Sequence, residues 1–423
     1  MVRPSRVVLL CFEGPDLYSQ VGGLGVRVTE LADAFADRGY AVDLIFIGDP
    51  KAAPVEECRP GLRLRRWSQW ISAYHPRDVY DGEIGKINDF TASVPPFVVD
   101  QLIAPAAARG ERVLVMAEEW QTAPATIALD RLLRERRLRH VATILWNANN
   151  TYGFRTIDWT ALKAAATITT VSKYMKFELS SRGVQPLVIH NGIPERLLAG
   201  PSRLHVEGWR RALGDRPALV KVGRFDPDKR WLQAIDAVER LVRSDDVDTR
   251  LIMRGGNQPH GAEVIRRAVS YGLEVSAVER VGSDEELFEA VARAPGRIID
   301  VRTFLSQELL YGLYAAGEAV LANSGKEPFG LVGLEVMAAG GLAVCGSTGE
   351  EYAEPFVNAI VVDTDDGREL AAALLAVLRD HELSERLRAA GRETAKRYTW
   401  PGVIAMLEKK LEFIEAAQFE GAF

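Results

Sequence analysis

The chain has 423 residues, more than one hydrophobic core usually organises, so its length predicts two domains. Apolar residues make up 47% of the sequence and charged residues 26%, the proportions of a globular rather than a disordered protein. The formal net charge is −6 and no long basic run occurs, which argues against nucleic acid as a partner.

Cysteine usage and hydropathy predict the compartment. Cys11, Cys58 and Cys345 are scattered and odd in number, so we expect reduced thiols and no disulfide framework. The sequence has no C-x-x-C, H-E-x-x-H or histidine cluster, and it therefore predicts no metal site. The amino-terminal apolar run is too short for a signal peptide, and no stretch is apolar for long enough to cross a bilayer. We expect a cytoplasmic protein without an integral membrane segment, and nothing in the sequence indicates its oligomeric state.

The first elements predict a parallel α/β domain. Arg6–Phe12 is an apolar run of strand length, and Ala41–Ile47 is another. Between them, a loop with Gly22, Gly23 and Gly25 leads into apolar residues at helical spacing. Glycines at a helix start let the backbone approach a ligand close to the positive end of the helix. A tight turn that needs glycine only for its shape is the alternative.

Residues 50–100 lack a clear period, and we expect them to be irregular. They carry several aromatic side chains among prolines and charges, namely Trp67, Trp70, Tyr74, His75 and Tyr80. Such a loop could stack on a sugar ring, but packing into a small satellite core is the simpler expectation.

Polar residues follow the next two predicted strands. Arg112–Met116 leads to Glu118, and Val141–Trp146 leads to three asparagines. Ligands of open α/β sheets lie beyond the carboxyl ends of the strands, so these residues are candidates for a binding site. Glu118 could accept hydrogen bonds from sugar hydroxyls, or it could be an acid at an ordinary helix start.

The second half opens after a proline- and glycine-rich segment, 194–216. The strand Ala218–Val222 is followed by Asp226 as a helix cap and a proline at the first helical position. Arg224 at the strand end and Lys229 in the first helical turn would then converge above a helix start, as at a diphosphate site. A surface charge pair of little consequence is the alternative.

Strands and helices then alternate to the end of the chain. The strands are expected at Arg250–Arg254, Glu274–Val281, Ile298–Val301, Ala319–Ala322, Leu342–Gly346 and Ile360–Val362. The helices are expected near 262–271, 284–293, 306–316, 366–379, 382–397 and 400–417.

The sequence E-P-F-G-L, residues 327–331, predicts a further helix start. Proline suits the first helical position, so we expect a helix from Pro328. The backbone amides of Phe329, Gly330 and Leu331 would then be available to an anion.

Two carboxylates flank this helix start, Glu327 and, eight residues later, Glu335. Glu335 shares a helix face with apolar residues, where a carboxylate needs a hydrogen-bonding partner such as a ribose diol. A capping box from Ser324 to Glu327 is the alternative, but Pro328 disfavours the α conformation of Glu327.

The motifs together resemble one enzyme family. E-P-F-G-L with a second glutamate is similar to the E-x7-E motif of retaining GT-B glycosyltransferases, especially glycosyltransferase family 4 and the related glycogen and starch synthases. V-G-G-L-G, G-R-x-x-x-x-K and the turn Gly349-Glu350-Glu351 also resemble that family, in the expected order. Three positions depart from its pattern: Gln20 replaces a lysine, Val26 an aspartate, and Glu118 the histidine that contacts the donor sugar.

The resemblance implies the GT-B fold, an α/β architecture of two doubly wound Rossmann-like domains facing across a cleft. Residues 1–200 would form the acceptor-side domain, with 400–423 crossing back onto it. Residues 201–399 would form the donor-side domain, with the nucleotide base near 302–305.

The resemblance also implies transfer of a hexose from a nucleotide diphosphate sugar to a hydroxyl acceptor, with retention and without a cofactor or metal. Arg224 and Lys229 would neutralise the leaving diphosphate, and Glu327 and Glu118 would face the sugar and its developing positive charge. The remaining donor-binding residues would be Gly22, Gly23, Gly25, Phe329, Gly330, Leu331 and Glu335. The acceptor and the choice among UDP-, ADP- and GDP-linked donors stay open. A catalytically impaired nucleotide-sugar-binding protein, or a hydrolase or epimerase of the same fold, is the alternative.

Overall fold

The computed structural model describes residues 4–420 apart from 280, 348 and 350. The chain divides into two compact units. Unit 1 comprises Met1–Gly192 and Trp400–Phe423, and unit 2 comprises Ile193–Thr399. The sequence had placed the boundary at residue 200, and the division in the structure falls after Gly192.

Unit 1 is built on an eight-stranded sheet in the order β3-β4-β2-β1-β5-β6-β7-β8. All neighbouring strands are parallel except β3 and β4. The strands are β1 (Arg6–Leu10), β2 (Ala41–Ile47), β3 (Val55–Arg59), β4 (Leu62–Trp67), β5 (Val113–Glu118), β6 (Ala142–Ala148), β7 (Thr167–Thr170) and β8 (Leu187–Val188).

Residues 50–100 are not irregular, and that prediction was wrong. They form β3, β4, a short α2 (Gln69–Ser72) and a long α3 (Glu83–Phe97). β4 alternates buried leucines with arginines because it lies near the edge of the sheet, so it lacks the continuous apolar run of a central strand. Pro95 and Pro96 lie inside the last turn of α3.

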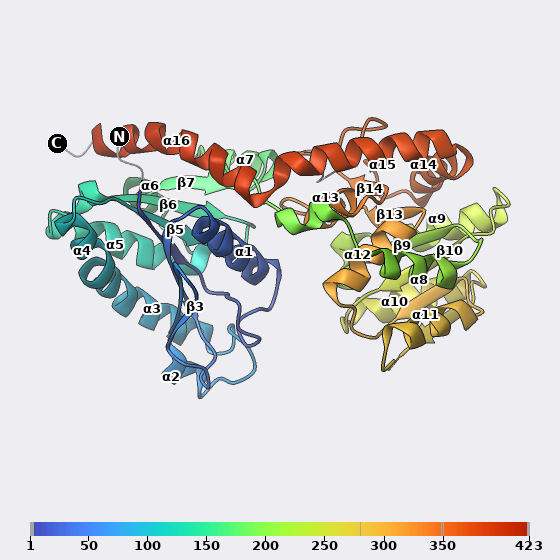
Figure 1. Cartoon of the computed structure of the whole chain (residues 1–423), viewed down its shortest axis with the longest axis horizontal. Helices are drawn as coiled ribbons and strands as arrows, with labels where there is room; N and C mark the ends of the chain where they lie inside the picture. Colours follow the sequence, from blue (N-terminus) through green and yellow to red (C-terminus); the bar gives the residue numbers. More distant parts are fainter. Residues whose placement is uncertain (1–3, 280, 348, 350, 421–423) are drawn as a thin grey trace. The chain divides into compact units, whose positions relative to one another are not determined.

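Helices cover both faces of the unit 1 sheet. α1 (Gly23–Asp37) and α16 (Trp400–Glu420) contribute apolar side chains to one core with β1 and β2. In Figure 1 the red α16 lies beside the blue and teal elements of unit 1, although it ends the sequence. α3 packs on α5 (Ala123–Glu135), which in turn contacts β6. The remaining helices are α4 (Ala104–Ala108), α6 (Trp159–Ala165) and α7 (Lys173–Ser180), with a π-helical turn at Val98–Ile103.

Unit 2 has a seven-stranded parallel sheet in the order β11-β12-β10-β9-β13-β14-β15. The strands are β9 (Ala218–Val222), β10 (Arg250–Arg254), β11 (Val275–Val278), β12 (Ile298–Val301), β13 (Ala319–Ala322), β14 (Ala343–Gly346) and β15 (Ile360–Val362). Apart from β11 at the edge of the sheet, most residues of these strands are buried and apolar, which is why the sequence located them closely.

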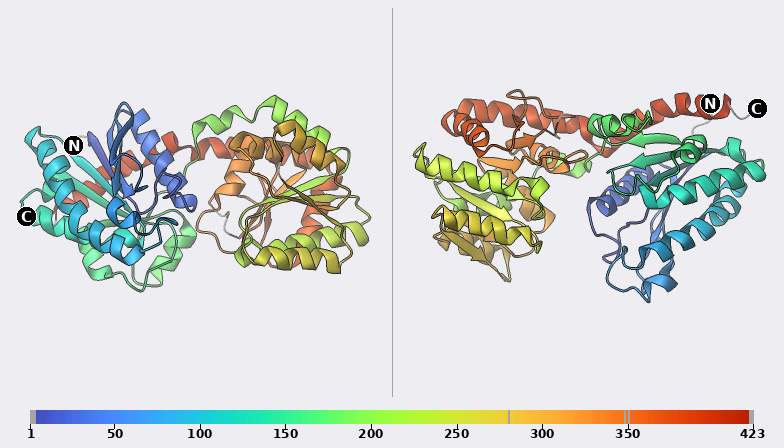
Figure 2. Two further views of the ribbon diagram at one scale, coloured as in Figure 1. Left: turned by 90° about the horizontal axis from the view of Figure 1, so that it is seen from below. Right: turned by 180° about the vertical axis from the view of Figure 1, so that it is seen from behind.

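The views in Figure 2 show the strands of unit 2 between layers of helices. Side chains of α9, α10 and α14 form one core with the sheet, and α8 packs on α11 and α12. The helices are α8 (Arg203–Leu213), α9 (Trp231–Arg243), α10 (His260–Ser270), α11 (Asp284–Arg293), α12 (Gln307–Ala316), α13 (Leu331–Ala339), α14 (Gly367–Arg379) and α15 (His381–Ala395). Each unit is therefore a doubly wound α/β sheet, as the sequence predicted.

Candidate functional site

The strand order of each unit marks one edge where ligands bind. Chain connections leave the sheet in opposite directions on either side of a central strand, and this opens a crevice at the carboxyl ends. In unit 1 the reversal lies between β1 and β5, and in unit 2 between β9 and β13. Most of the predicted site residues follow these four strands.

After β1, the carboxylate of Glu13 closes the glycine loop of unit 1. Its Oε2 accepts the backbone N–H groups of Gly22 at 3.0 Å and Gly25 at 2.9 Å. Its other oxygen accepts the hydroxyl of Tyr80, and the Glu13 side chain is buried. Burial, with the nearby Glu13, raises the pKa of the Tyr80 phenol, so Tyr80 remains a donor. The sequence drew attention to the glycines but not to Glu13, whose only signal was an acid directly after a buried strand.

At the end of β5, Glu118 is fully buried and bound to Arg27 of α1. The guanidinium meets both carboxylate oxygens at 3.3 Å and also donates to Asn191. Asn147 and Asn149 donate to the same carboxylate at 2.9 and 2.6 Å. Four donors from unit 1 thus hold Glu118, and its proposed contact with the donor sugar remains a prediction. Arg27 was missed, because its pairing depends on a contact across 91 residues.

The next residue, Glu119, combines burial with a strained backbone. Its φ of 70° lies in a region that non-glycine residues rarely adopt. Its carboxyl group accepts the backbone N–H of Asn149 at 2.7 Å, while Trp146 donates to its carbonyl. Burial raises the pKa of Glu119 to about 8. A neutral acid that can donate a hydrogen bond therefore lies beside an ionic one.

The aromatic residues of 67–80 do not form a single cluster. Trp67 is half-buried and packs against Phe97 in a tilted arrangement, with ring centres 5.1 Å apart. Trp70 and Tyr74, in contrast, are 64% and 81% exposed. Tyr80 reaches Glu13, as described above.

In unit 2, the loops after β9 and β13 meet. Lys229 Nζ and Glu327 Oε1 form an ion pair, and Gly325 N–H donates to Asp228 O at 2.8 Å. Both charged side chains are largely buried, with exposures of 21% and 23%. The two sequence motifs, about a hundred residues apart, thus lie at one place on the edge of the sheet.

Arg224 lies beside this pair but is more exposed. An added Cβ on the neighbouring Gly223 would lie 3.9 Å from Lys229 Cδ, so Lys229 passes close to this turn. Arg224 pairs with Asp226 at 3.1 Å and its side chain is 69% exposed. Among the described residues, no contact joins Arg224 to Lys229, so their predicted convergence on one ligand stays a prediction.

The two helices of this region begin later than the sequence predicted. α13 begins at Leu331 rather than Pro328, because Gly330 adopts a left-handed conformation with φ 75°. Phe329, the residue before Gly330, is buried, and its ring centre lies 5.7 Å from that of Tyr352. Similarly, Lys229 ends a short 3₁₀ turn, and α9 begins after the left-handed Arg230.

Leu331 is therefore the one predicted amide that lies in the first turn of α13. The amides of Phe329 and Gly330 precede the helix, and their role in donor binding remains a prediction. On α13, Leu334 and Ala338 are buried, while Leu331 and Glu335 are half-buried, so the carboxylate is on the more open side.

A buried lysine, Lys221 of β9, was missed by the sequence analysis. Its ammonium donates to Asn323 Oδ1 at 2.6 Å and Leu321 O at 3.1 Å, and Asn323 in turn donates to Gln233 at 2.6 Å. Burial, together with the nearby Lys229, lowers the pKa of Lys221 to about 7. A lysine within the apolar run of β9 was the available signal.

A pocket of about 770 Å³ lies at the carboxyl ends of β10 and β12. Arg254, the glycines at 255 and 256, Gln258 and the start of α10 line one side, and 300–302 line the other. Asp300 pairs with Arg302 at 2.7 Å. The sequence analysis had placed the nucleotide base near 302–305, next to this pocket.

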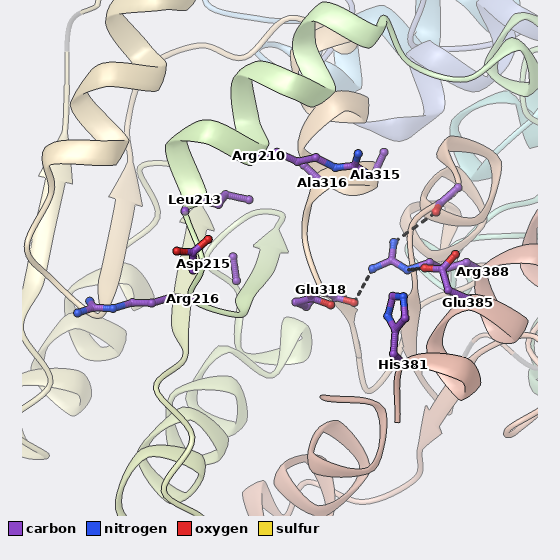
Figure 3. A pocket seen from close by; sticks show the side chains of 13 residues that line it. Arg210, Leu213, Asp215, Arg216, Ala315, Ala316, Glu318, His381, Glu385 and Arg388 are labelled. Carbon is purple, nitrogen blue, oxygen red and sulfur yellow. Dashed lines mark hydrogen bonds and ion pairs between the residues drawn. The ribbon is translucent and has the colours of Figure 1, made fainter. Parts of the chain in front are cut away.

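A second pocket, of about 490 Å³, lies at the opposite, amino-terminal edge of the same sheet (Figure 3). Arg388 donates there to the carbonyls of Gly317 and Glu318, both at 2.9 Å. In Figure 3 the Arg388 side chain reaches toward Glu318, whereas Arg216 points to the other side. Burial lowers the pKa of Arg388. Arg388 therefore satisfies carbonyl groups that follow the end of α12, which is a structural role.

Among the described residues, no group of three or more His, Cys, Asp or Glu side chains could hold a metal ion. No described helix combines the length and the apolar character needed to span a membrane. The predicted turn at Gly349-Glu350-Glu351 includes Glu350, which lies outside the described residues.

Residues 209–394 match the profile of the family described as Glycosyl transferases group 1. The chain is 26% identical over 411 residues to a D-inositol 3-phosphate glycosyltransferase of Geodermatophilus obscurus, covering 91% of this chain and 83% of that protein. It is 25% identical over 418 residues to a phosphatidyl-myo-inositol mannosyltransferase of Propionibacterium freudenreichii, covering 95% and 94%.

Solved structures agree on the fold. A sucrose-phosphate synthase of Thermosynechococcus elongatus superimposes with a TM-score of 0.67 at 20% identity, covering 97% of this chain and all of that one. The catalytic domain of starch synthase IV from Arabidopsis thaliana gives 0.68 at 15% identity, covering 98% and 99%. The motifs and the matched domain make the chain similar to glycosyltransferases of this group, and the two doubly wound sheets have the GT-B fold that the sucrose-phosphate synthase and starch synthase structures share.

Proposed function

We propose that the chain transfers a hexose from a nucleotide diphosphate sugar to a hydroxyl acceptor, with retention of the anomeric configuration and without a metal. One observation carries the proposal. The ion pair of Lys229 and Glu327 joins the G-R-x-x-x-x-K and E-x7-E motifs at the switch point of unit 2. A cation for the leaving group and a carboxylate for the sugar then lie side by side, as the transfer requires.

In this proposal unit 2 holds the donor. Lys229, Arg224 and the first-turn amides of α13 would bind the diphosphate and stabilise its charge as it leaves. Glu335 would bind the ribose hydroxyls. The pocket between β10 and β12, of about 770 Å³ and lined by both polar and apolar residues, would take the base.

In this proposal Glu327 interacts with both Lys229 and the donor sugar. Its ion pair with Lys229 fixes its position, and its carboxylate would face the sugar as positive charge develops at the anomeric carbon. The acceptor hydroxyl would attack from the face that the phosphate leaves, which retains the configuration. Because Arg224 and Lys229 handle the leaving charge, we expect transfer to be insensitive to a chelator.

Unit 1 would bind the acceptor at the switch point between β1 and β5. Glu118, which ends β5, and the glycines at 22, 23 and 25, which follow β1, keep their expected role toward the donor. The relatives named D-inositol 3-phosphate glycosyltransferase and phosphatidyl-myo-inositol mannosyltransferase support a polyol, free or phosphate-bearing, as the acceptor class.

Release of nucleoside diphosphate tests this function. Purified chain is incubated with UDP-, ADP- and GDP-hexoses, each with and without a mixture of sugar and polyol acceptors. We expect diphosphate release from one donor only when acceptor is present. Release without acceptor would indicate a hydrolase, and binding without release under any condition would indicate a binding protein.

A further inference from the structure

Three arginines lie together at the amino-terminal edge of the unit 2 sheet, opposite the edge of the proposed donor site. Arg250 opens β10, and its backbone N–H donates at 3.1 Å to Pro217 O, next to Arg216. The backbone N–H of Leu251 donates at 2.8 Å to the carbonyl of Arg297, directly before β12. The register of β9, β10 and β12 therefore places Arg216 and Arg297 on either side of Arg250.

A single carboxylate, that of Asp248, serves the two outer arginines. Arg216 Nε and Arg297 Nη1 lie 3.0 and 2.6 Å from its oxygens. The hydrogen bond from Arg297 lowers the pKa of Asp248, so the carboxylate is ionised. These are the charged groups that act on Arg250, and three cations thus share one anion. Together with Arg250 they form the arginine cluster.

Arg250 is the buried member of the arginine cluster. The residue is only 8% exposed, and its Nε is buried without a hydrogen-bond partner among the described residues. Burial, together with the nearby Arg216 and Arg297, lowers the pKa of its guanidinium. Buried charged donors normally have a partner, because leaving one without an acceptor is costly. Arg250 therefore calls for an oxygen that the described part of the chain does not supply.

The outer members keep the arginine cluster open to solvent. The side chains of Arg216 and Arg297 are 43% and 31% exposed, and that of Asp248 is 57% exposed. Arg216 also lines the pocket of about 490 Å³, and in Figure 3 its side chain points away from Arg388. A small ligand can therefore approach Arg250 between side chains that are themselves accessible.

We propose that the arginine cluster binds a phosphate-type dianion, with Arg250 at the base of the site and Arg216 and Arg297 as its outer contacts. The planar N–H forks of guanidinium groups match the oxygens of a phosphate. The two charges of such a ligand balance the excess of the three arginines over Asp248. Inorganic phosphate and a phosphomonoester share this chemistry. The site lies apart from the donor edge and does not depend on the proposed function.

Calorimetry of the whole chain tests this inference. Inorganic phosphate and glycerol phosphate are each titrated at constant ionic strength, so that screening is the same throughout. We expect saturable binding by the wild type. In Arg250→Met, which loses the buried charge, the affinity should be at least about tenfold lower. The tighter of the two ligands identifies free phosphate or a phosphomonoester as the source.

Two control variants separate this site from other cations of unit 2. Arg293→Met removes an exposed arginine, and Lys229→Ala removes the cation of the proposed donor site. Both should keep the binding that Arg250→Met loses. Arg216→Gln serves as a second cluster variant if Arg250→Met does not fold. The inference is overturned by the absence of saturable binding in the wild type, or by equal affinity in the folded cluster variants. A loss confined to Lys229→Ala would also overturn it, because the phosphate would then bind at the donor edge.

Discussion

Glu119 is a buried acid that keeps its proton to a higher pH in the folded chain than in the unfolded chain. Its pKa is raised from 4.5 to about 8 by burial. Between these two pH values the folded chain holds a proton that the unfolded chain has lost, so the free energy of unfolding falls as the pH rises from 4.5 to 8. Below this window both states are protonated, and above it both are ionised, so the contribution is flat.

The variant Glu119→Gln isolates this contribution because its side chain does not titrate. We expect the wild type to lose up to about 1.4 kcal/mol of stability per pH unit across the window relative to the variant. Urea unfolding of both proteins at several pH values measures the difference. Identical pH dependence of the two proteins would show that the Glu119 carboxyl group is not perturbed.

The neighbouring residue, Glu118, contributes to the stability of the fold through its charge. Its carboxylate is the counter-ion of the buried Arg27, so Glu118→Gln leaves that buried cation without an opposite charge. We expect the free energy of unfolding of Glu118→Gln to be about 3 kcal/mol lower than that of the wild type. Glu57→Gln, on the exposed β3, should change stability by less than about 0.5 kcal/mol. A stable Glu118→Gln protein with impaired transfer would instead assign the carboxylate to the sugar.

At the scale of elements, the glycine loop offers a matched pair of substitutions. Gly25→Ala forces a Cβ against Gly14 O and Glu13, so we expect a loss of about 1–3 kcal/mol in the free energy of unfolding. Gly23→Ala meets no neighbour and should leave stability unchanged or raise it by up to about 1 kcal/mol. Urea unfolding and kcat/KM of both variants provide the readout. Equal losses of stability would contradict the packing described for Gly25.

Elements also show what the sequence could and could not predict. β9, β10, β12, β13 and β15 were located at the bounds observed, because buried parallel strands leave a continuous apolar signal. The start of α13 was missed because Gly330 adopts a left-handed conformation, which the proline rule for helix starts does not predict. The hydrogen bond from Gly22 to Glu13 and the ion pair of Glu118 with Arg27 were missed because they are tertiary contacts. The motifs in the sequence identified Lys229 and Glu327 as site residues, but only the structure shows that they form an ion pair.

At the scale of the whole molecule, unit 1 is completed by the end of the chain. Trp400, Ile404, Leu407 and Ile414 of α16 are buried in the core that contains β1 and β2. A chain ending at Thr399 would expose that core while leaving unit 2 intact. We expect faster amide hydrogen exchange in β1 and β2 and unchanged exchange in β9. Protection of β1 at the level of the full chain would contradict the assignment of α16 to unit 1.

The most direct measurement is the affinity of the whole chain for nucleoside diphosphates. UDP, ADP and GDP are titrated into the wild type and Lys229→Ala by calorimetry. The control is Lys396→Ala, which removes a lysine from an exposed ion pair with Glu393 in the same unit. We predict that Lys229→Ala weakens the tightest diphosphate at least about tenfold, because one charge-assisted contact is lost, and that Lys396→Ala leaves it unchanged. Equal affinity of the wild type and Lys229→Ala would contradict the donor site.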